Sequence, residues 1–197
     1  MTVDVKSQNL VLRLWFLMHR DYRLLVNCED RIYGEKGLTM EQFSVLATIK
    51  YIGRPARPTD IAQWMGRGPN TVSMLVDRMV RAGLVRRTRG KVDRRVVRVS
   101  LTSKGENAVK LATPAGWEFI QKILSPISCK DKDALASLLE TVTCDLRGYL
   151  NPEVDMAKII KNSPTNQPNL YELMAKNVFP AGSEAKRQVG KKGKTIR

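Results

Sequence analysis

Hydrophobic residues near the N-terminus recur at helical spacing and predict a long helix that is apolar on two opposite sides. One stripe consists of Leu10, Leu14, Leu17, Leu24, Leu25 and Cys28, and the opposite stripe consists of Leu12, Trp15, Phe16 and Val26. A helix with two apolar sides is expected to pack on its own core and on a second partner, for which another copy of the chain is the natural candidate. The alternative is a helix at the centre of a monomeric core.

Three shorter helices are predicted next, and start or stop residues mark each of them. The first is an amphipathic run that follows Thr39. Thr59 is expected to cap a short helix over 60–65. After a Gly-Arg-Gly turn, Pro69 suits the first position of a further helix, which should stop at Gly83.

The pattern then changes to a hairpin and two further helices. β-Branched residues on both sides of a basic, glycine-containing segment at 89–95 predict a β-hairpin with an exposed tip. Ser103, followed three residues later by Glu106, predicts a capping box for a helix that Pro114 should kink or break. The last clear helix is predicted over 129–149, with one apolar stripe made of Leu135, Leu138, Leu139, Val142, Leu146 and Tyr149.

The net charge narrows the choice of partners. The chain carries 34 Lys and Arg against 19 Asp and Glu, a formal net charge of +15. Ten of the basic residues fall within 66–98, where Asp77 and Asp93 are the two acids, and nine more follow residue 150. Such an excess favours a polyanion or an anionic membrane surface. No apolar stretch approaches the roughly 18 residues of a membrane span, and the first nine residues do not resemble a secretory signal, so we expect no membrane partner.

Cysteine and histidine usage argues against several chemistries. Cys28, Cys129 and Cys144 are odd in number and widely spaced, which is not typical of a disulfide framework. Together with His19 they are the chain's complete set of Cys and His side chains, and His19 has no evident nucleophile partner. We therefore expect no enzyme, no metal, no cofactor and a reducing, cytoplasmic setting. Redox activity of the cysteines stays open.

The two helices around the Gly-Arg-Gly turn suggest a helix-turn-helix, and the basic hairpin after them makes it winged. In the second helix Val72, Leu75, Val76, Met79 and Val80 are expected to face inward. The outward and flanking residues are expected to contact DNA, together with Thr59 in the preceding helix: Asn70, Thr71, Ser73, Met74, Arg78 and Arg81. The simplest role for Asp77 is a pair with Arg81 along the helix. An ordinary solvated polar face is the alternative, which the basic wing disfavours.

The predicted wing supplies long cations that suit DNA. They are Arg89, Lys91, Arg94 and Arg95. An arginine at the tip can enter a narrow, electronegative minor groove. Asp93 would repel phosphate, so we expect it to orient a neighbouring arginine.

The hairpin and the helix after it also carry a signature, Asp-x-Arg followed after five residues by Leu-Thr-x-x-Gly, in the form of Asp93, Arg95, Leu101, Thr102 and Gly105. With this signature and the segments 70–79 and 82–85, the sequence resembles the MarR family of winged helix-turn-helix transcription regulators over about residues 8–150. The resemblance implies a homodimer joined through the first and last helices. It also implies a pseudo-palindromic double-stranded DNA operator and a repressor relieved by a small-molecule effector.

Family members commonly bind small, often phenolic, ligands between the dimerisation helices and the DNA-binding lobe. By location, Trp15, Met18, His19 and Phe43 would line such a pocket for a small aromatic effector, unless they are core or interface residues. Some relatives sense oxidants through a cysteine near the start of the first helix, which Cys28, near the helix end, does not match.

The predicted protein is thus mainly α-helical with a small β-hairpin wing. It combines an N-terminal dimerisation helix (1–37), a winged helix-turn-helix domain (38–102), C-terminal dimerisation helices (103–150) and a basic, partly disordered tail (151–197). The leading function is a dimeric, sequence-specific DNA-binding regulator. A sequence-indifferent nucleic-acid-binding protein and a winged-helix protein-interaction adaptor are the alternatives.

Overall fold

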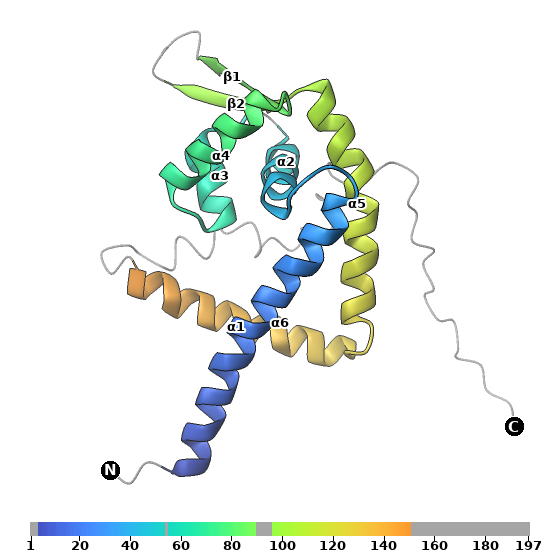
Figure 1. Ribbon diagram of the computed structural model, residues 1–197. Coiled ribbons are helices and arrows are strands. Elements are labelled where there is room, and N and C mark those ends of the chain that lie inside the picture. Colours follow the sequence, from blue (N-terminus) through green and yellow to red (C-terminus); the bar gives the residue numbers. More distant parts are fainter. Residues whose placement is uncertain (1–3, 54, 90–95, 151–197) are drawn as a thin grey trace, which may run out of the picture.

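The computed structural model describes residues 4–53, 55–89 and 96–150, and these form six helices and one two-stranded sheet (Figure 1). Three short helices and the hairpin gather at one end of the molecule, and three longer helices extend from them. The predicted fold class, mainly α-helical with a β-hairpin wing, is confirmed.

Helix α1 (Val5–Gly34) is exposed along most of its length. Tyr33, the penultimate residue of the helix, is its buried residue and stacks on Phe43 with 4.0 Å between ring centroids. Upstream most residues of both predicted stripes are exposed, including Leu10 at 56% and Phe16 at 67%, and Leu17 and Val26 are half-buried. A position at the centre of a monomeric core is therefore wrong for this helix. Its expected packing on the chain's own core is confirmed near the C-terminal end only.

Helix α2 (Met40–Ile52) begins with a capping box. The hydroxyl of Thr39 accepts a hydrogen bond from the Gln42 N–H at 3.2 Å, and the Gln42 side chain accepts one from the Thr39 N–H at 3.0 Å. These reciprocal bonds satisfy two backbone donors that the first turn would otherwise leave unpaired. The helix predicted after Thr39 is confirmed.

Helix α3 (Pro58–Met65) begins two residues earlier than predicted. Its N-cap is Arg57, whose backbone N–H donates to the Asp60 carboxylate at 3.0 Å. The predicted cap at Thr59 is wrong, because Pro58 with its fixed φ already occupies the first helical position. Thr59 lies inside the first turn.

Helix α4 (Pro69–Arg81) has the predicted start and stop. Pro69 occupies its first position. Gly66 after α3 and Gly83 after α4 have φ of 61° and 71°, a left-handed conformation that glycine adopts without a steric penalty. The two helices and their turn form the predicted helix-turn-helix.

Strands β1 (Val85–Arg89) and β2 (Val97–Leu101) pair as an antiparallel hairpin, as predicted. Ala56 exchanges two backbone hydrogen bonds with Val99, of 2.9 and 2.8 Å, and so ties the segment before α3 to the far side of β2. The predicted hairpin tip at 90–95 lies outside the described residues.

Helix α5 (Ser103–Leu124) runs through Pro114 without a break. Its N-cap is Thr102, whose hydroxyl accepts from the Gly105 N–H at 3.1 Å, so the predicted capping box at Ser103 is wrong by one residue. The predicted break does not occur because tertiary packing holds the helix on both sides of the proline: Val109, Ala112, Thr113 and Gly116 are all buried.

Helix α6 (Cys129–Leu150) has no buried residue. The hydroxyl of Ser128 accepts from the Asp131 N–H at 3.1 Å and caps its first turn. The predicted stripe is exposed from Leu135 to Tyr149. None of the described residues of the same chain covers this apolar face.

The hydrophobic core lies between α2, α3, α4, the hairpin and α5. Its fully buried large side chains are Val45, Leu46, Ile61, Val72, Val76, Met79, Val85, Val99 and Val109. An ion pair of 2.6 Å between Lys50 and Glu106 adds a link from α2 to α5.

Candidate nucleic-acid interface

Helix α4 buries one face and exposes the other. Val72, Leu75, Val76 and Met79 are buried as predicted, whereas Val80 lies at the edge of the buried stripe and is 37% exposed, so its predicted inward position is wrong. The exposed residues include most of the predicted DNA contacts: Asn70, Thr71, Met74, Arg78 and Arg81. Ser73 is half-buried.

Two further predicted contacts lie at the surface on neighbouring elements. Thr59 is exposed in the first turn of α3, and Arg89 is exposed at the end of β1. The remaining wing residues, Lys91, Asp93, Arg94 and Arg95, lie outside the described residues. The DNA contacts expected of Lys91, Arg94 and Arg95, and the expected role of Asp93 in orienting a neighbouring arginine, remain predictions.

The strand β1 contributes a residue that the sequence analysis missed. Arg87 donates from Nη1 to the Asp77 carboxylate at 2.6 Å and from Nη2 to the Ser73 hydroxyl and carbonyl, each at 3.2 Å. The predicted pairing of Asp77 with Arg81 is therefore wrong. Spacing within one helix could not reveal this partner, because only the folded hairpin brings β1 beside α4.

The end of α4 is held by the start of α5. The Thr102 hydroxyl donates to the Gly83 carbonyl at 2.6 Å, and the Lys104 ammonium donates to the Ala82 carbonyl at 2.9 Å. Gly105 packs so closely that an added Cβ would lie 2.1 Å from the Leu84 carbonyl oxygen. The Leu-Thr-x-x-Gly motif thus links the long helix α5 to the exit of α4.

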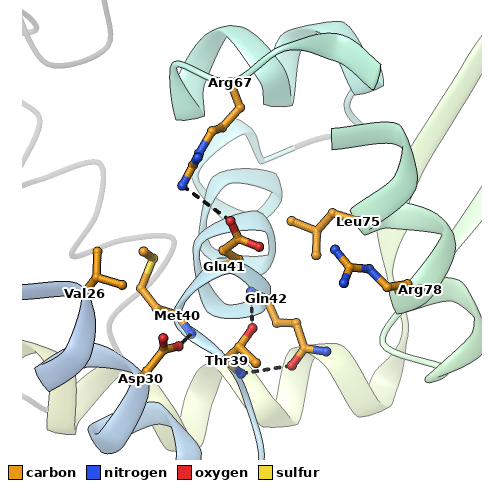
Figure 2. Close-up of a pocket in the computed structure, with 9 residues that line it drawn as sticks. All are labelled: Val26, Asp30, Thr39, Met40, Glu41, Gln42, Arg67, Leu75 and Arg78. Carbon is orange, nitrogen blue, oxygen red and sulfur yellow. Dashed lines mark hydrogen bonds and ion pairs between the residues drawn. The ribbon is translucent and has the colours of Figure 1, made fainter. Parts of the chain in front are cut away.

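A cavity of about 330 Å³ lies between α1, α2 and α4 (Figure 2). Leu75 and Arg78 point into it from α4, and the other lining residues are Val26, Asp30, Thr39, Met40, Glu41, Gln42 and Arg67. Arg67 lies 3.4 Å from Glu41 and donates to the Tyr22 hydroxyl at 3.4 Å. The turn of the helix-turn-helix is thereby connected to α1 and α2.

The four residues predicted to line an effector pocket do not come together there. Trp15, Met18 and His19 lie on the exposed part of α1, where the Trp15 and His19 rings meet edge to face at 4.4 Å. Phe43 is half-buried against Tyr33. None of the four lines the cavity between α1, α2 and α4.

Titratable groups near this junction are shifted by burial. Burial and, to a smaller extent, the neighbouring Asp30 carboxylate raise the pKa of the half-buried Glu29 carboxyl. Burial and then Glu29 raise the pKa of the Tyr33 hydroxyl. Glu29 is therefore an acid whose charged form is disfavoured in the folded chain.

The cysteines, possible metal ligands and possible membrane-spanning helices were considered within the described part of the chain. Cys28 and Cys129 are exposed thiols and Cys144 is half-buried. The described residues contain no group of three or more His, Cys, Asp or Glu placed to hold a metal ion. Among the described helices, none is both long and apolar enough to cross a membrane.

An exposed polar helix, held between a second helix and a β-hairpin, defines a winged helix-turn-helix protein. The sequence model of the MarR family matches residues 38–97. The regulator PecS of Dickeya dadantii (strain 3937) is 30% identical over 115 residues, which cover 57% of this chain and 69% of PecS. The repressor MdtR of Bacillus subtilis (strain 168) is 36% identical over 72 residues, covering 36% of this chain and 46% of MdtR.

Solved structures agree with this assignment. The M. tuberculosis regulator MosR, solved in complex with DNA, is 28% identical, with a TM-score of 0.55 and coverage of 65% of this chain and 94% of MosR. The ligand-free organohalide-sensing regulator RdhR has a TM-score of 0.66 at 19% identity, covering 82% of this chain and 89% of RdhR. The chain belongs to the MarR family of transcription regulators, and the resemblance seen in the sequence is confirmed.

Proposed function

We propose that this chain is a homodimeric, sequence-specific DNA-binding repressor whose operator affinity is lowered by a small aromatic effector. The observation that carries the proposal is the exposed N-terminal half of α4, where Asn70, Thr71 and Met74 face solvent beside a basic strand. Polar side chains in this part of a second helix read base edges in the major groove, and a methionine can contact a thymine methyl group. The DNA complex of the relative MosR supports the same use of the fold.

Dimer formation is supported by the uncovered apolar faces of α1 and α6. Leu10, Leu14 and Phe16 on α1, and Leu138 and Leu146 on α6, are all more than half exposed in the single chain. Apolar patches of this kind mark surfaces that another molecule covers. Sedimentation equilibrium at micromolar concentration should give twice the chain mass, and a stable monomer would contradict the dimer.

Sequence specificity is tested by selecting bound duplexes from a random DNA pool. The selected duplex should bind at least roughly a thousandfold more tightly than its scrambled version. Footprinting should protect two half-sites about one helical turn apart, because a two-fold dimer presents its two α4 helices in that way. Equal binding to both duplexes would favour the sequence-indifferent alternative. If the selection enriches no duplex and the protein binds no DNA, a protein-interaction adaptor would be favoured.

Repression is tested by transcription in vitro from a promoter that carries the selected duplex. Wild-type protein should lower transcript yield, because a dimer on the operator excludes the polymerase. Asn70→Ala should restore the yield at the same protein concentration. Increased transcription with wild-type protein would identify an activator.

The effector proposal rests on the cavity between α1, α2 and α4. Its volume of about 330 Å³ falls in the range of small-molecule sites, roughly 300–1,000 Å³. Val26, Met40 and Leu75 provide apolar walls. The Glu41 carboxylate is paired with Arg67, and the Asp30 carboxylate accepts a hydrogen bond from the Met40 N–H. Arg78 then provides a cation, which suits an aromatic compound with one anionic or strongly polar group. An occupant would contact α1 and α4 together and could alter how α4 is presented.

The direct test is a titration of the protein–operator complex with 2,4-dichlorophenol and benzoate. Either compound should release DNA in a saturable manner. Met40→Phe, which adds volume inside the cavity, should weaken that response. A response that Met40→Phe leaves unchanged would place the effector elsewhere, and no response to either compound would contradict the proposed ligand chemistry.

A further inference from the structure

Side-chain alternation along β1 separates its basic residues into two groups. Val85 and Arg87 share one face of the strand, and Val85 is buried against the core. Arg86 and Thr88 share the other face, where the Arg86 guanidinium donates to Ser100 across the hairpin at 3.1 Å. Arg87 is thereby directed toward α4, whereas Arg86 remains a residue of the hairpin surface.

The Arg87 guanidinium has three acceptors on one side of α4. They are the Asp77 carboxylate at 2.6 Å and the hydroxyl and carbonyl oxygens of Ser73, each at 3.2 Å. Ser73 and Asp77 are four residues apart, so they lie on the same side of the helix one turn apart. The Arg87 side chain is 32% exposed, so this group is partly shielded from water.

We propose that Arg87 is a positioning residue that holds the wing strand against α4 and neutralises Asp77. This inference rests on the proposed function as a DNA-binding regulator. Arginine suits the role because its planar fork can grip a carboxylate and neighbouring oxygens at the same time. An unpaired Asp77 on the exposed side of α4 would repel DNA phosphates. Arg87 therefore acts on DNA through the geometry of α4 and the wing.

The proposed role predicts an unusual effect on DNA affinity when the Asp77 carboxylate is removed. Removing an acid from a DNA-binding surface normally strengthens binding to every sequence, because repulsion of phosphate is relieved. Here Asp77→Ala also releases Arg87 and loosens the wing strand relative to α4. We therefore expect Asp77→Ala to weaken binding to the selected duplex.

The same geometry changes the role predicted for Ser73. Its hydroxyl already accepts a hydrogen bond from Arg87, and the residue is half-buried. We infer that Ser73 supports the position of β1 and that base reading falls to its exposed neighbours Asn70, Thr71 and Met74.

The experiment measures binding of full-length variants to the selected duplex and to its scrambled version over a range of salt concentrations. The variants are Asp77→Ala, Arg87→Ala, the double variant and Arg87→Lys. The matched control is Arg86→Ala, which removes the same charge from the adjacent position, where the guanidinium donates to Ser100 across the hairpin. Melting temperatures are recorded for all variants, and Asp77→Asn replaces Asp77→Ala if the latter unfolds.

Because the lost hydrogen bonds join charged groups, we expect Asp77→Ala and Arg87→Ala each to lower the affinity for the selected duplex about tenfold. The affinity for scrambled DNA should fall less than about threefold. The double variant should bind no worse than Arg87→Ala, because one interaction is lost only once. Arg87→Lys should recover little of the loss, since a lysine keeps the charge without the fork. Arg86→Ala should weaken both duplexes by similar factors.

Two results would overturn the inference. One is tighter binding of Asp77→Ala to both duplexes, which would make Asp77 a simple source of repulsion. The other is an equal loss on both duplexes for Arg87→Ala that adds to the effect of Asp77→Ala, which would make Arg87 a phosphate contact. A wild-type protein that does not distinguish the duplexes would instead refute the proposed function.

Discussion

Replacing Gly105 by alanine tests how α4 is held in place. The new Cβ would lie 2.1 Å from the Leu84 carbonyl oxygen, 3.1 Å from the Leu84 carbonyl carbon and 3.4 Å from a methyl carbon of Leu46. The first distance is more than about 1 Å shorter than a non-bonded contact allows. Both atoms of Leu84 belong to the backbone, so no side-chain rotation can relieve the clash. Either α5 or the connection from α4 to β1 must move.

The magnitude follows from three contributions. Forcing an extra carbon into a packed site costs about 1–3 kcal/mol. The Leu84 carbonyl accepts a hydrogen bond from the Thr102 N–H at 3.1 Å and also lies 3.1 Å from the Thr102 hydroxyl, whose one proton is shared with the Gly83 carbonyl. Losing these contacts would cost about 1–2 kcal/mol together. Alanine is favoured over glycine inside a helix by about 1 kcal/mol, which offsets part of this cost. We expect Gly105→Ala to reduce the free energy of unfolding by about 3 kcal/mol.

The assay is thermal unfolding of the full chain, followed by circular dichroism. A loss of this size in a chain of 197 residues corresponds to a Tm lower by roughly 6–12 °C. The matched control is Gly34→Ala at the end of α1, where an added Cβ meets nothing within 4 Å and the Tm should stay the same or rise. A Gly105→Ala protein that melts at or above the wild-type temperature would refute the reasoning.

Three further changes test other parts of the structure. Gly116→Ala should lower the Tm because its Cβ would lie 2.4 Å from the Tyr33 hydroxyl oxygen. Adding Tyr33→Phe should recover part of the loss in Tm, and additive losses for the two substitutions would exclude that contact. Burial raises the pKa of Glu29, so its contribution to stability is present at acidic pH and is lost as the pH rises through the folded-state pKa. Glu29→Gln should therefore raise the Tm at neutral pH and have less effect at acidic pH, and a lower Tm at neutral pH would contradict the sign. Asn70→Ala should weaken binding to the selected duplex by about 1–3 kcal/mol and leave binding to scrambled DNA nearly unaffected. Arg94→Ala should weaken binding to both duplexes and lower the slope of log affinity against log salt concentration by about 0.9. Equal losses of affinity for Asn70→Ala on both duplexes would exclude base reading by Asn70.

Local signals in the sequence were sufficient where one turn of chain decides the conformation. Pro69 at the first position of α4 and Gly83 after its end are examples, because a fixed φ and a positive φ are properties of single residues. The same kind of signal misplaced two helix caps by a residue or two. Thr59 and Ser103 are both good capping residues, but Pro58 and Thr102 had already begun the helices.

Contacts between elements required the folded chain. The partner of Asp77 is Arg87 on β1, although Arg81 has favourable helical spacing, and this choice depends on how the hairpin packs beside α4. Pro114 was expected to kink or break a helix, yet α5 is unbroken because buried residues on both sides hold it in place.

The sequence by itself determined the order of the elements, the buried stripe of α4 and the membership of the MarR family, since these depend on residue type and spacing along the chain. Only the tertiary structure decided which polar side chains remain available. Ser73 was expected to contact DNA like Asn70, and Asp77 was expected to pair with Arg81, but Arg87 forms hydrogen bonds with both. A hydrogen bond between residues distant in sequence depends on backbone positions that spacing does not encode. For this reason the sequence pattern could predict the elements, whereas the contacts between them could be known only from the tertiary structure.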